Sequence, residues 1–482
     1  YLATTGVFLF WRIILFENTR EATDVGSILD RFQSDPVESL FRLPLDLLVD
    51  FVEAVILAWF APANATLSGL TTSALIATTV LGTVAVGLVV FYFFWMRRRS
   101  LSPDEEQEPD SAWITSAALV GITGIIFTML PTLLSDREIR LLDLFDRYTI
   151  PPMMGISILV GAGLFALQPT LRIGALALLV SLSVVTQFNT LNEYRAEWQM
   201  QKDLWWQLSW RAPQIEPDTT LLVHFGTPPS PATNPTIQVS DDYEVWGPAS
   251  IIYYPQATDP VIFGDPLRQW HLDMLLSQQT LEREIRGVTF SIPPENTLIV
   301  AIPRQNTGCL RVVDRELQEL PFQADALLRA VMPYSDASRI ITEGAAPDLP
   351  AGIFGAEPAH TWCYYFQSAE LARQRGEWAD VVELGNAARD RGYDPEDETE
   401  WLPFIEGYAM QEQYADASEL AARVADQSPE TWPSLCRLSD RLSQANRIIS
   451  DQQPIIGQDL VLTLNELAQC SVPATEQTSV AP

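Results

Sequence analysis

Long apolar runs without any charge dominate the first 192 positions of the chain. Four such runs cover residues 67–96, 111–135, 149–171 and 173–192. Each reaches roughly the 20 residues that a helix needs to cross about 30 Å of hydrocarbon. Residues 1–11 match the end of a fifth run, which stops at Arg12. We therefore predict a polytopic membrane bundle of about five spans over residues 1–192, and we expect earlier helices before Tyr1.

A different pattern covers residues 43–60. Asp46, Asp50 and Glu53 recur at a spacing that places three carboxylates on one helical face, opposite leucine and valine side chains. We interpret this segment as an amphipathic helix lying at the membrane interface. The alternative is a span inside the bundle whose polar face is covered by other helices.

The basic residues predict the orientation of the membrane region. Arg97–Arg99 follow the run 67–96 directly, and basic clusters stay on the cytoplasmic side. Counting onward places the loop 136–148, and everything after about residue 193, outside the cytoplasm. We therefore predict a multi-pass protein of the cell membrane with an extracytoplasmic C-terminal part. That part contains all four cysteines, Cys309, Cys363, Cys436 and Cys470, which predict up to two disulfides; four buried free thiols are the alternative.

Residues 193–212 predict a helix that continues out of the last apolar run. It carries five aromatic side chains, namely Tyr194, Trp198, Trp205, Trp206 and Trp210. Aromatic residues at this position anchor a helix at the membrane interface, and this is our prediction. A stacking platform for a sugar is the alternative.

After residue 212 short apolar runs alternate with Pro and Gly. Four of them predict strands, at 220–225, 250–254, 297–302 and 309–313, and a helical stretch covers about 267–285. Strands around a helix predict an α/β domain over residues 213–345. It has no glycine-rich phosphate motif and no nucleophile motif. His224, His271 and His360 lie far apart without metal-ligand spacing, so we interpret each as structural and predict no metal site.

Residues 346–472 have a helical pattern that repeats. The repeat fits the tetratricopeptide template of about 34 residues, in which large residues of one helix pack against a small residue of the next. The matching residues are Trp401, Tyr408, Tyr414, Ala417 and Pro429, and upstream Ala369, Gly376, Trp378 and Ala388. We predict two degenerate tetratricopeptide-like repeats, a capping helix at 431–449, and a disordered tail at 473–482.

The charge of the chain limits its ligands. The chain has 61 acidic and 30 basic residues, and its net charge of −31 lies mostly after residue 212. Such a surface repels nucleic-acid phosphates, so we expect no nucleic acid partner. We identify no cofactor. The expected partners are membrane lipids and, at the helical repeats, a basic or polar protein.

One external loop, residues 136–148, gathers basic residues near an apolar run. It contains Arg137, Arg140 and Arg147, and it ends at Tyr148. Guanidinium groups bind phosphate oxygens in a two-pronged manner, so these four residues are candidate ligands of a lipid phosphate. The alternative is that the arginines pair with the neighbouring carboxylates of Asp136, Glu138, Asp143 and Asp146.

Two stretches resemble known proteins. Residues 146–152, DRYTIPP, resemble the Arg-Tyr-x-x-x-Pro element of the polytopic C-type glycosyltransferases, which use polyprenyl-phosphate sugars. Residues 360–366, HTWCYYF, and 400–409, EWLPFIEGYA, are similar to the soluble tail of uncharacterised bacterial membrane proteins related to that superfamily. The resemblance implies a lipid-phosphate sugar as donor and extends to Arg147 and Tyr148. In C-type transferases the catalytic acid lies in the first external loop, so the resemblance implies a catalytic residue upstream of this sequence.

Two functions follow from these observations. The first is a glycosyltransferase-like protein that transfers a sugar from a lipid-phosphate carrier at the outer face of the membrane. The second is a non-catalytic, membrane-anchored scaffold that binds a protein partner through its repeats.

Overall fold

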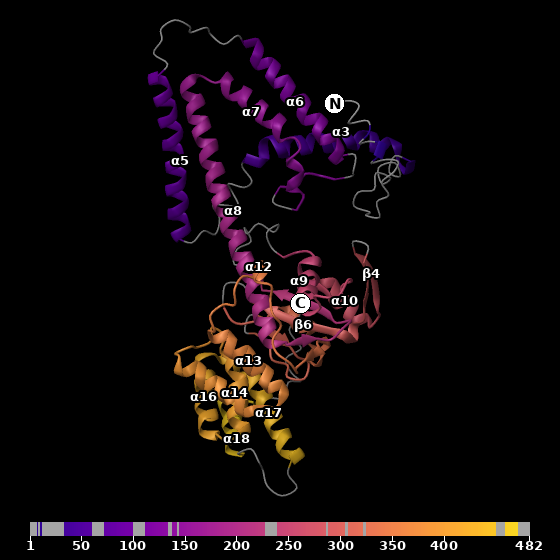
Figure 1. The fold of residues 1–482 in the computed structure, drawn as a ribbon, viewed down its shortest axis with the longest axis vertical. Coiled ribbons are helices and arrows are strands. Elements are labelled where there is room, and N and C mark those ends of the chain that lie inside the picture. The colour runs from indigo at the N-terminus through magenta and orange to yellow at the C-terminus, as the bar shows by residue number, and fades with distance from the viewer. Residues whose placement is uncertain are drawn as a thin grey trace. The chain divides into compact units, whose positions relative to one another are not determined.

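The computed structural model describes two compact units, which are treated separately below. The N-terminal unit comprises Tyr1–Glu197 with Ser230–Gln238, and the C-terminal unit comprises Trp198–Pro229 with Val239–Pro482. Figure 1 shows that helices build the first unit, whereas the second combines strands and helices. The described residues are 7, 10–11, 33–59, 72–99, 111–133, 137–141, 144–226, 239–285, 288–303, 307–321, 324–449 and 458–470.

Three helices of the described chain are long and apolar enough to cross a membrane, namely Thr72–Arg99, Ala112–Leu133 and Pro169–Arg211. They belong to α5, α6 and α8. The elements of the N-terminal unit are α3 (Pro36–Val52), its π-helical continuation η3 (Glu53–Leu57), α5 (Thr72–Arg99), α6 (Ser111–Leu133), the 3-10 helix η4 (Leu144–Thr149), α7 (Met153–Ala166) and the first part of α8 (Pro169–Arg211).

The prediction of a full-length span over residues 149–171 is wrong. The helix there is α7, with 14 residues, and at 1.5 Å per residue it is about 21 Å long, which is shorter than the hydrocarbon core. It ends at Ala166, and the next residue, Leu167, is extended. The guanidinium group of Arg172 donates hydrogen bonds to the carbonyl oxygens of Leu164 and Leu167. The described residues thus contain three candidate spans instead of the four predicted there, and most of residues 1–11 lie outside the described chain.

Small residues allow close contact between pairs of helices in this unit. On α6 and α7, a Cβ atom at Gly121 would lie 2.9 Å from the carbonyl oxygen of Gly155. On α5 and α8, the hydroxyl of Ser181 donates to the carbonyl oxygen of Gly82 at 3.1 Å. Contacts of this kind are typical of helices that pack inside a membrane, where backbones approach through small residues.

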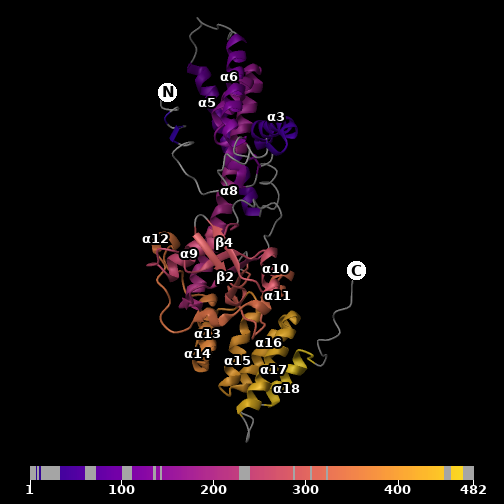
Figure 2. The same cartoon turned by 90° about the vertical axis from the view of Figure 1, so that its right-hand side faces the viewer.

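Helix α3 lies across the direction of α5 and α8, as Figures 1 and 2 show. It begins at Pro36, preceded by Asp35, whose side chain accepts a hydrogen bond from Glu38 N. Asp50 is 2% exposed, and its carboxylate accepts a hydrogen bond from the backbone N–H of Ile139 at 3.0 Å. The crosswise direction favours the interfacial interpretation of residues 43–60 over a span. However, the carboxylate of Asp50 is hydrogen-bonded to the loop between α6 and α7 and is not exposed to lipid headgroups.

A four-stranded sheet of order β3-β2-β6-β7 forms the centre of the α/β region in the C-terminal unit. Strands β2 (Thr220–Phe225), β3 (Phe263–Pro266) and β6 (Thr297–Ile302) are parallel, and β7 (Arg311–Val313) is antiparallel to β6. The end of α8 and α9 (Tyr243–Tyr253) cover one face. The other face is covered by α10 (Gln269–Ser277), the hairpin β4 (Leu281–Ile285)–β5 (Val288–Ile292), and α11 (Ala326–Val331).

Short elements complete this region. Strands β1 (Gln214–Ile215) and β8 (Ile340–Ile341) form an antiparallel pair. The others are η5 (Pro294–Asn296), η7 (Met332–Tyr334), η8 (Ala337–Arg339) and α12 (Ala351–Phe354).

The predicted strands are confirmed at three of four places. Residues 220–225 and 297–302 are β2 and β6, and the stretch 309–313 contains β7. The strand predicted at 250–254 is wrong, because this segment forms the end of α9, whose apolar residues lie at helical spacing. The helix predicted over 267–285 is too long, since α10 ends at Ser277 and β4 follows it.

The last turns of α8 lie in the core of the α/β region. Trp205 is 1% exposed and Trp206 is 9% exposed, and both belong to the apolar cluster that covers the sheet. The prediction that the aromatic residues of 193–212 anchor the membrane interface is therefore wrong for these two, and burial also excludes Trp205 as a stacking platform. Tyr194 and Trp198 are exposed.

The last part of the chain is helical and packs in consecutive pairs. Helices α13 (Trp362–Arg375) and α14 (Trp378–Asp390) contact each other, as do α15 (Leu402–Met410) and α16 (Tyr414–Gln427), and α17 (Trp432–Ile449) and α18 (Gln458–Leu467). The 3-10 helices η9 (Glu398–Trp401) and η10 (Pro429–Thr431) precede α15 and α17. The predicted helix 431–449 is α17, and Ala417 is fully buried on α16. The assignment to tetratricopeptide repeats stays a prediction, and residues 473–482 lie outside the described chain.

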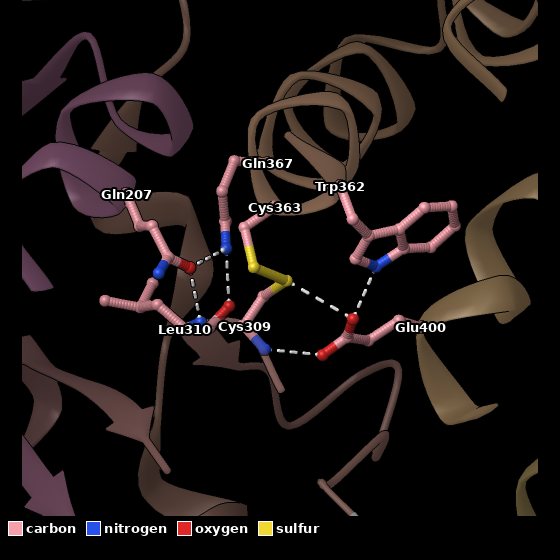
Figure 3. The surroundings of a disulfide bond; sticks show 7 residues. All are labelled: Gln207, Cys309, Leu310, Trp362, Cys363, Gln367 and Glu400. Atoms are coloured by element: carbon pink, nitrogen blue, oxygen red, sulfur yellow. Dashed lines mark hydrogen bonds between the residues drawn. A yellow bond between two sulfur atoms is a disulfide. The ribbon is translucent and has the colours of Figure 1, made fainter. Parts of the chain in front are cut away.

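Two disulfides crosslink the C-terminal unit, so the alternative of four free thiols is wrong. Cys309, between β6 and β7, bonds to Cys363 on α13, and Cys436 on α17 bonds to Cys470 after α18. Beside the first disulfide, Gln207 Oε1 accepts a hydrogen bond from Leu310 N at 2.7 Å, and Gln367 Nε2 donates to the Leu310 carbonyl oxygen at 2.6 Å (Figure 3). Helix α8, the sheet and α13 are thereby joined.

A buried ionic cluster forms a second link between the α/β region and the helices. Arg373 on α13 donates hydrogen bonds to both carboxylate oxygens of Glu319, at 2.9 and 3.0 Å, and to Glu406 on α15. Arg441 on α17 reaches the same Glu319 at 2.6 Å. Burial acts to raise the pKa of Glu319, but Arg373 and Arg441 outweigh it and hold the pKa well below its usual range. The carboxylate is therefore ionised inside the protein.

Candidate functional site

The predicted phosphate ligands lie in the loop between α6 and α7, which is described over residues 137–141 and 144–150. Ile139 is buried against Ile125 and Met129 of α6, and Tyr148 packs against the same apolar cluster. The hydrogen bond from Ile139 N to Asp50 ties the loop to α3. The loop is thus held by contacts with α3 and α6.

Tyr148 contacts two of the predicted arginines. The guanidinium carbon of Arg137 lies 5.3 Å from the centroid of the Tyr148 ring, and that of Arg147 lies 5.5 Å from it. A cation near an aromatic face is attracted by about 0.5–1 kcal/mol at an exposed site. The structure therefore brings together three of the four predicted residues, although Arg137 and Arg147 are ten positions apart in sequence.

Arg140 lies apart from this group and has a carboxylate partner. Its Nη2 atom is 2.9 Å from Glu138 Oε2, and both side chains are more than half exposed. For Arg140 the structure therefore shows the alternative, in which the arginine pairs with a neighbouring carboxylate. Within the described chain Arg147 forms no ion pair, whereas Asp136 and Asp143 lie outside it.

The chemistry available to this Arg137–Tyr148–Arg147 cluster is the binding of an oxyanion. The N–H donors of a guanidinium group lie in one plane, in an arrangement that matches the oxygens of a phosphate. Proline residues at 151 and 152 follow and lead directly into α7. The cluster contains no His, Asp or Glu side chain, so the chemistry that it offers is binding and not, by itself, catalysis.

The histidines lie at three separate places in the C-terminal unit. His224 Nε2 is 2.9 Å from Asp325 Oδ2, and His271 is fully buried and stacked on Trp270. His360 stacks on Tyr364 with ring centroids 3.5 Å apart. Among the residues that the structure describes, no group of three or more His, Cys, Asp or Glu side chains could hold a metal ion.

One open pocket of about 360 Å³ was not predicted from the sequence. Trp206, Trp210, Asp348 and Glu357 are among the residues that line it. Trp210 Nε1 donates to Glu357 Oε1 at 3.0 Å, and His360 Nε2 is 2.9 Å from the same oxygen. The hydrogen bond with His360 lowers the pKa of Glu357. The sugar-platform alternative stays open for Trp210, which lines this pocket.

A group of charged residues at the end of β3 also escaped the sequence analysis. Asp265 is buried, and its carboxylate lies 3.5 Å from His271 Nε2 and 3.6 Å from Arg283 Nη1. Burial, together with the charge of Asp265, raises the pKa of Asp242. Asp265 follows a glycine and precedes a proline, a sequence that is more typical of a turn than of a strand.

The Arg137–Tyr148–Arg147 cluster is the site on which the sequence pattern and the observed geometry converge. Its function is interpreted from its own contacts. Comparison of the chain with models of protein families, with curated proteins and with solved structures finds no match.

Proposed function

We propose that this protein binds the phosphate of a lipid-linked sugar at the outer face of the cell membrane and acts there as a glycosyltransferase-like protein. Arg137 and Arg147 bind the phosphate, and Tyr148 holds both guanidinium groups. The observation that carries the proposal is the contact of two guanidinium groups with one tyrosine ring, at 5.3 and 5.5 Å. Negative charge grows on the phosphate as a glycosidic bond to it breaks, and fixed cations stabilise that charge.

The proposal includes a multi-pass topology. Arg97–Arg99 end α5 and keep this end in the cytoplasm. Helix α6 then leads outward, so that the loop carrying Arg137 and Arg147 faces the outside. Helix α7, about 21 Å long, returns the chain to the start of α8 across a locally thinned hydrocarbon core. Helix α8 leads outward again into the C-terminal unit, whose two disulfides are typical of an oxidising compartment.

Binding of paired lipids to the full-length protein in detergent tests the proposal. One lipid is a polyprenyl-phosphate sugar, and the other has the same chain and sugar but no phosphate. Each charge-assisted hydrogen bond contributes about 1.5–3 kcal/mol, so we expect the phosphate-free lipid to bind at least about tenfold more weakly. Equal Kd values for the two lipids would contradict the proposal.

A second proposal is a non-catalytic scaffold that binds a protein partner through α13–α18, interpreted as tetratricopeptide-like repeats. The disulfide Cys309–Cys363 and the Arg373 cluster support it, because they hold these helices rigidly against the α/β region. The excess of acidic residues favours a basic peptide. Simultaneous replacement of Arg137 and Arg147 by alanine distinguishes the two proposals: a scaffold keeps its peptide affinity, whereas a lipid-phosphate protein loses lipid binding.

A further inference from the structure

The two sulfur atoms of the Cys309–Cys363 disulfide have different surroundings. Cys309 is 1% exposed, whereas Cys363 is partly exposed at the start of α13. The carboxyl group of Glu400 lies against the buried sulfur, with Oε2 at 3.2 Å from Cys309 Sγ (Figure 3). An outside reagent therefore reaches Cys363 first, and a titratable group contacts the sulfur that would be released.

Two hydrogen bonds hold Glu400 in this position, and a neighbouring glycine leaves room for it. The backbone N–H of Cys309 donates to Oε1 at 2.6 Å, and Trp362 Nε1 donates to Oε2 at 2.5 Å. Gly308, with a φ of +154°, leaves room for the carboxyl group, because a Cβ atom there would lie 3.0 Å from Glu400 Oε1. The side chain is fully buried. These contacts place the carboxyl group of Glu400 beside the Cys309 sulfur.

The surroundings of Glu400 let it carry a proton near neutral pH. Burial raises its pKa to about 7; Arg311 on β7 opposes this shift, and Asp397 before η9 adds to it. The guanidinium group of Arg311 donates a hydrogen bond to the hydroxyl of Thr399, which lies next to Glu400 in the sequence. Protonated Oε2 has one hydrogen to donate, and the sulfur of Cys309 is within reach.

We propose that Cys309–Cys363 is a thiol–disulfide exchange site in which Glu400 is the proton donor to Cys309. The thiolate of an external thiol attacks Cys363 Sγ and forms a mixed disulfide with it. The bond between the two protein sulfurs breaks, and its electron pair leaves on Cys309. Glu400 Oε2 gives its proton to that sulfur and becomes a carboxylate, so the external sulfur is oxidised and Cys309 is reduced to a thiol.

The reaction would release a connection inside the C-terminal unit. Cys309 belongs to the link between β6 and β7, and Cys363 belongs to α13, so exchange frees the sheet from the helices at this point. The inference does not rest on the proposed lipid-phosphate function. The second disulfide serves as an internal reference, because the polar contacts described for Cys436 and Cys470 are carbonyl oxygens, which supply no proton.

The test measures both disulfides in one tube of full-length protein. Reduced glutathione is added at pH values from about 5.5 to 8.5, the reaction is stopped with acid, free thiols are alkylated, and each disulfide is quantified by mass spectrometry. The ratio of the two rates cancels the ionisation of glutathione. For the wild type we expect the ratio of Cys309–Cys363 to Cys436–Cys470 opening to fall about tenfold or more as pH rises, because Glu400 loses its proton.

Two variants complete the test. Glu400→Gln cannot donate an acidic proton, so its ratio should be lower and independent of pH. Glu398→Gln removes a carboxyl group from the same 3-10 helix, outside the contact with the sulfur, and should keep the wild-type profile. If the ratio of the two opening rates in the wild type does not change with pH, the inference is overturned, and this measurement does not depend on the folding of any variant. A Glu400→Gln protein whose ratio changes with pH as in the wild type also overturns it.

Discussion

Gly121 of α6 and Gly155 of α7 approach each other so closely that a Cβ atom on Gly155 would lie 2.8 Å from the Gly121 carbonyl oxygen. We predict that Gly155→Ala forces the two helices apart and destabilises the protein by about 1–3 kcal/mol. Thermal unfolding of the detergent-solubilised protein measures the change. Gly163→Ala on the same helix is the control, because its Cβ would meet nothing within 4 Å. Equal melting temperatures for the two variants would contradict this packing.

The buried carboxylate of Glu319 predicts how stability depends on pH. Its pKa is lower in the folded protein than in the unfolded chain, because Arg373 and Arg441 outweigh the effect of burial. Its contribution is therefore fully present above its unfolded pKa, about 4.5, and is lost as the pH falls below that value.

Replacing Glu319 tests this contribution. Glu319→Gln leaves Arg373 and Arg441 with less negative charge, and breaking a buried pair costs about 3–5 kcal/mol. The variant should unfold at a lower urea concentration at pH 7 and lose less further stability than the wild type on acidification. Glu383→Gln changes an exposed carboxylate on α14 and should follow the wild-type curve. Parallel curves for Glu319→Gln and the wild type between pH 7 and pH 3 would show that the cluster is not stabilising.

The contact between α15 and α16 predicts the effect of a bulky residue at Ala417, which is fully buried. Ala417→Trp overpacks this contact, and we expect a loss of about 1–3 kcal/mol. Ala415→Trp lies on the exposed side of the same helix and should change the melting temperature little. The two variants carry the same substitution, so a similar melting temperature for both would be evidence against the helix pairing.

Sided chemical labelling tests the topology. The four native cysteines are in disulfides, so single cysteines introduced at Ser102 and Thr258 can be followed separately. In intact cells an impermeant maleimide should label Thr258→Cys, which is exposed in the C-terminal unit, and leave Ser102→Cys unlabelled. Lysed cells show that both sites react. The reverse pattern in intact cells would place the C-terminal unit in the cytoplasm.

The apolar pattern predicted helices correctly where an apolar run was long and contained no charged residue. It located α5, α6 and α8, but a count of charge-free positions could not show that α7 is short, because no charge lies between residues 149 and 171. The prolines at 151, 152 and 169 were the signal of its two ends. The pattern also could not tell the apolar end of α9 from a strand, since residues 250–254 are too few to show a period. Only the packed core shows that Trp205 faces protein and not lipid.

The sequence also predicted only some of the residues of the candidate sites. The sequence singled out Arg147 and Tyr148 by their place before an apolar run, but the approach of Arg137 depends on the loop folding back onto α3. Neither disulfide pairing could be read from spacing, because four cysteines allow three connectivities. Glu400 opens the stretch 400–409 noted in the sequence, but nothing there indicates its chemistry, which arises from burial beside Cys309, 91 positions away.

Lipid binding by arginine variants tests the proposed function most directly. The measurement is the Kd of a polyprenyl-phosphate sugar for the purified full-length protein, comparing the wild type with Arg147→Lys and Arg147→Ala. A lysine ammonium cannot reproduce a two-pronged contact, so we expect weaker binding for Arg147→Lys and weaker still for Arg147→Ala, by about tenfold or more. Arg140→Ala is the control, because Arg140 is already paired with Glu138, and its affinity should match the wild type. Equal affinity for the wild type and both Arg147 variants would contradict the lipid-phosphate site.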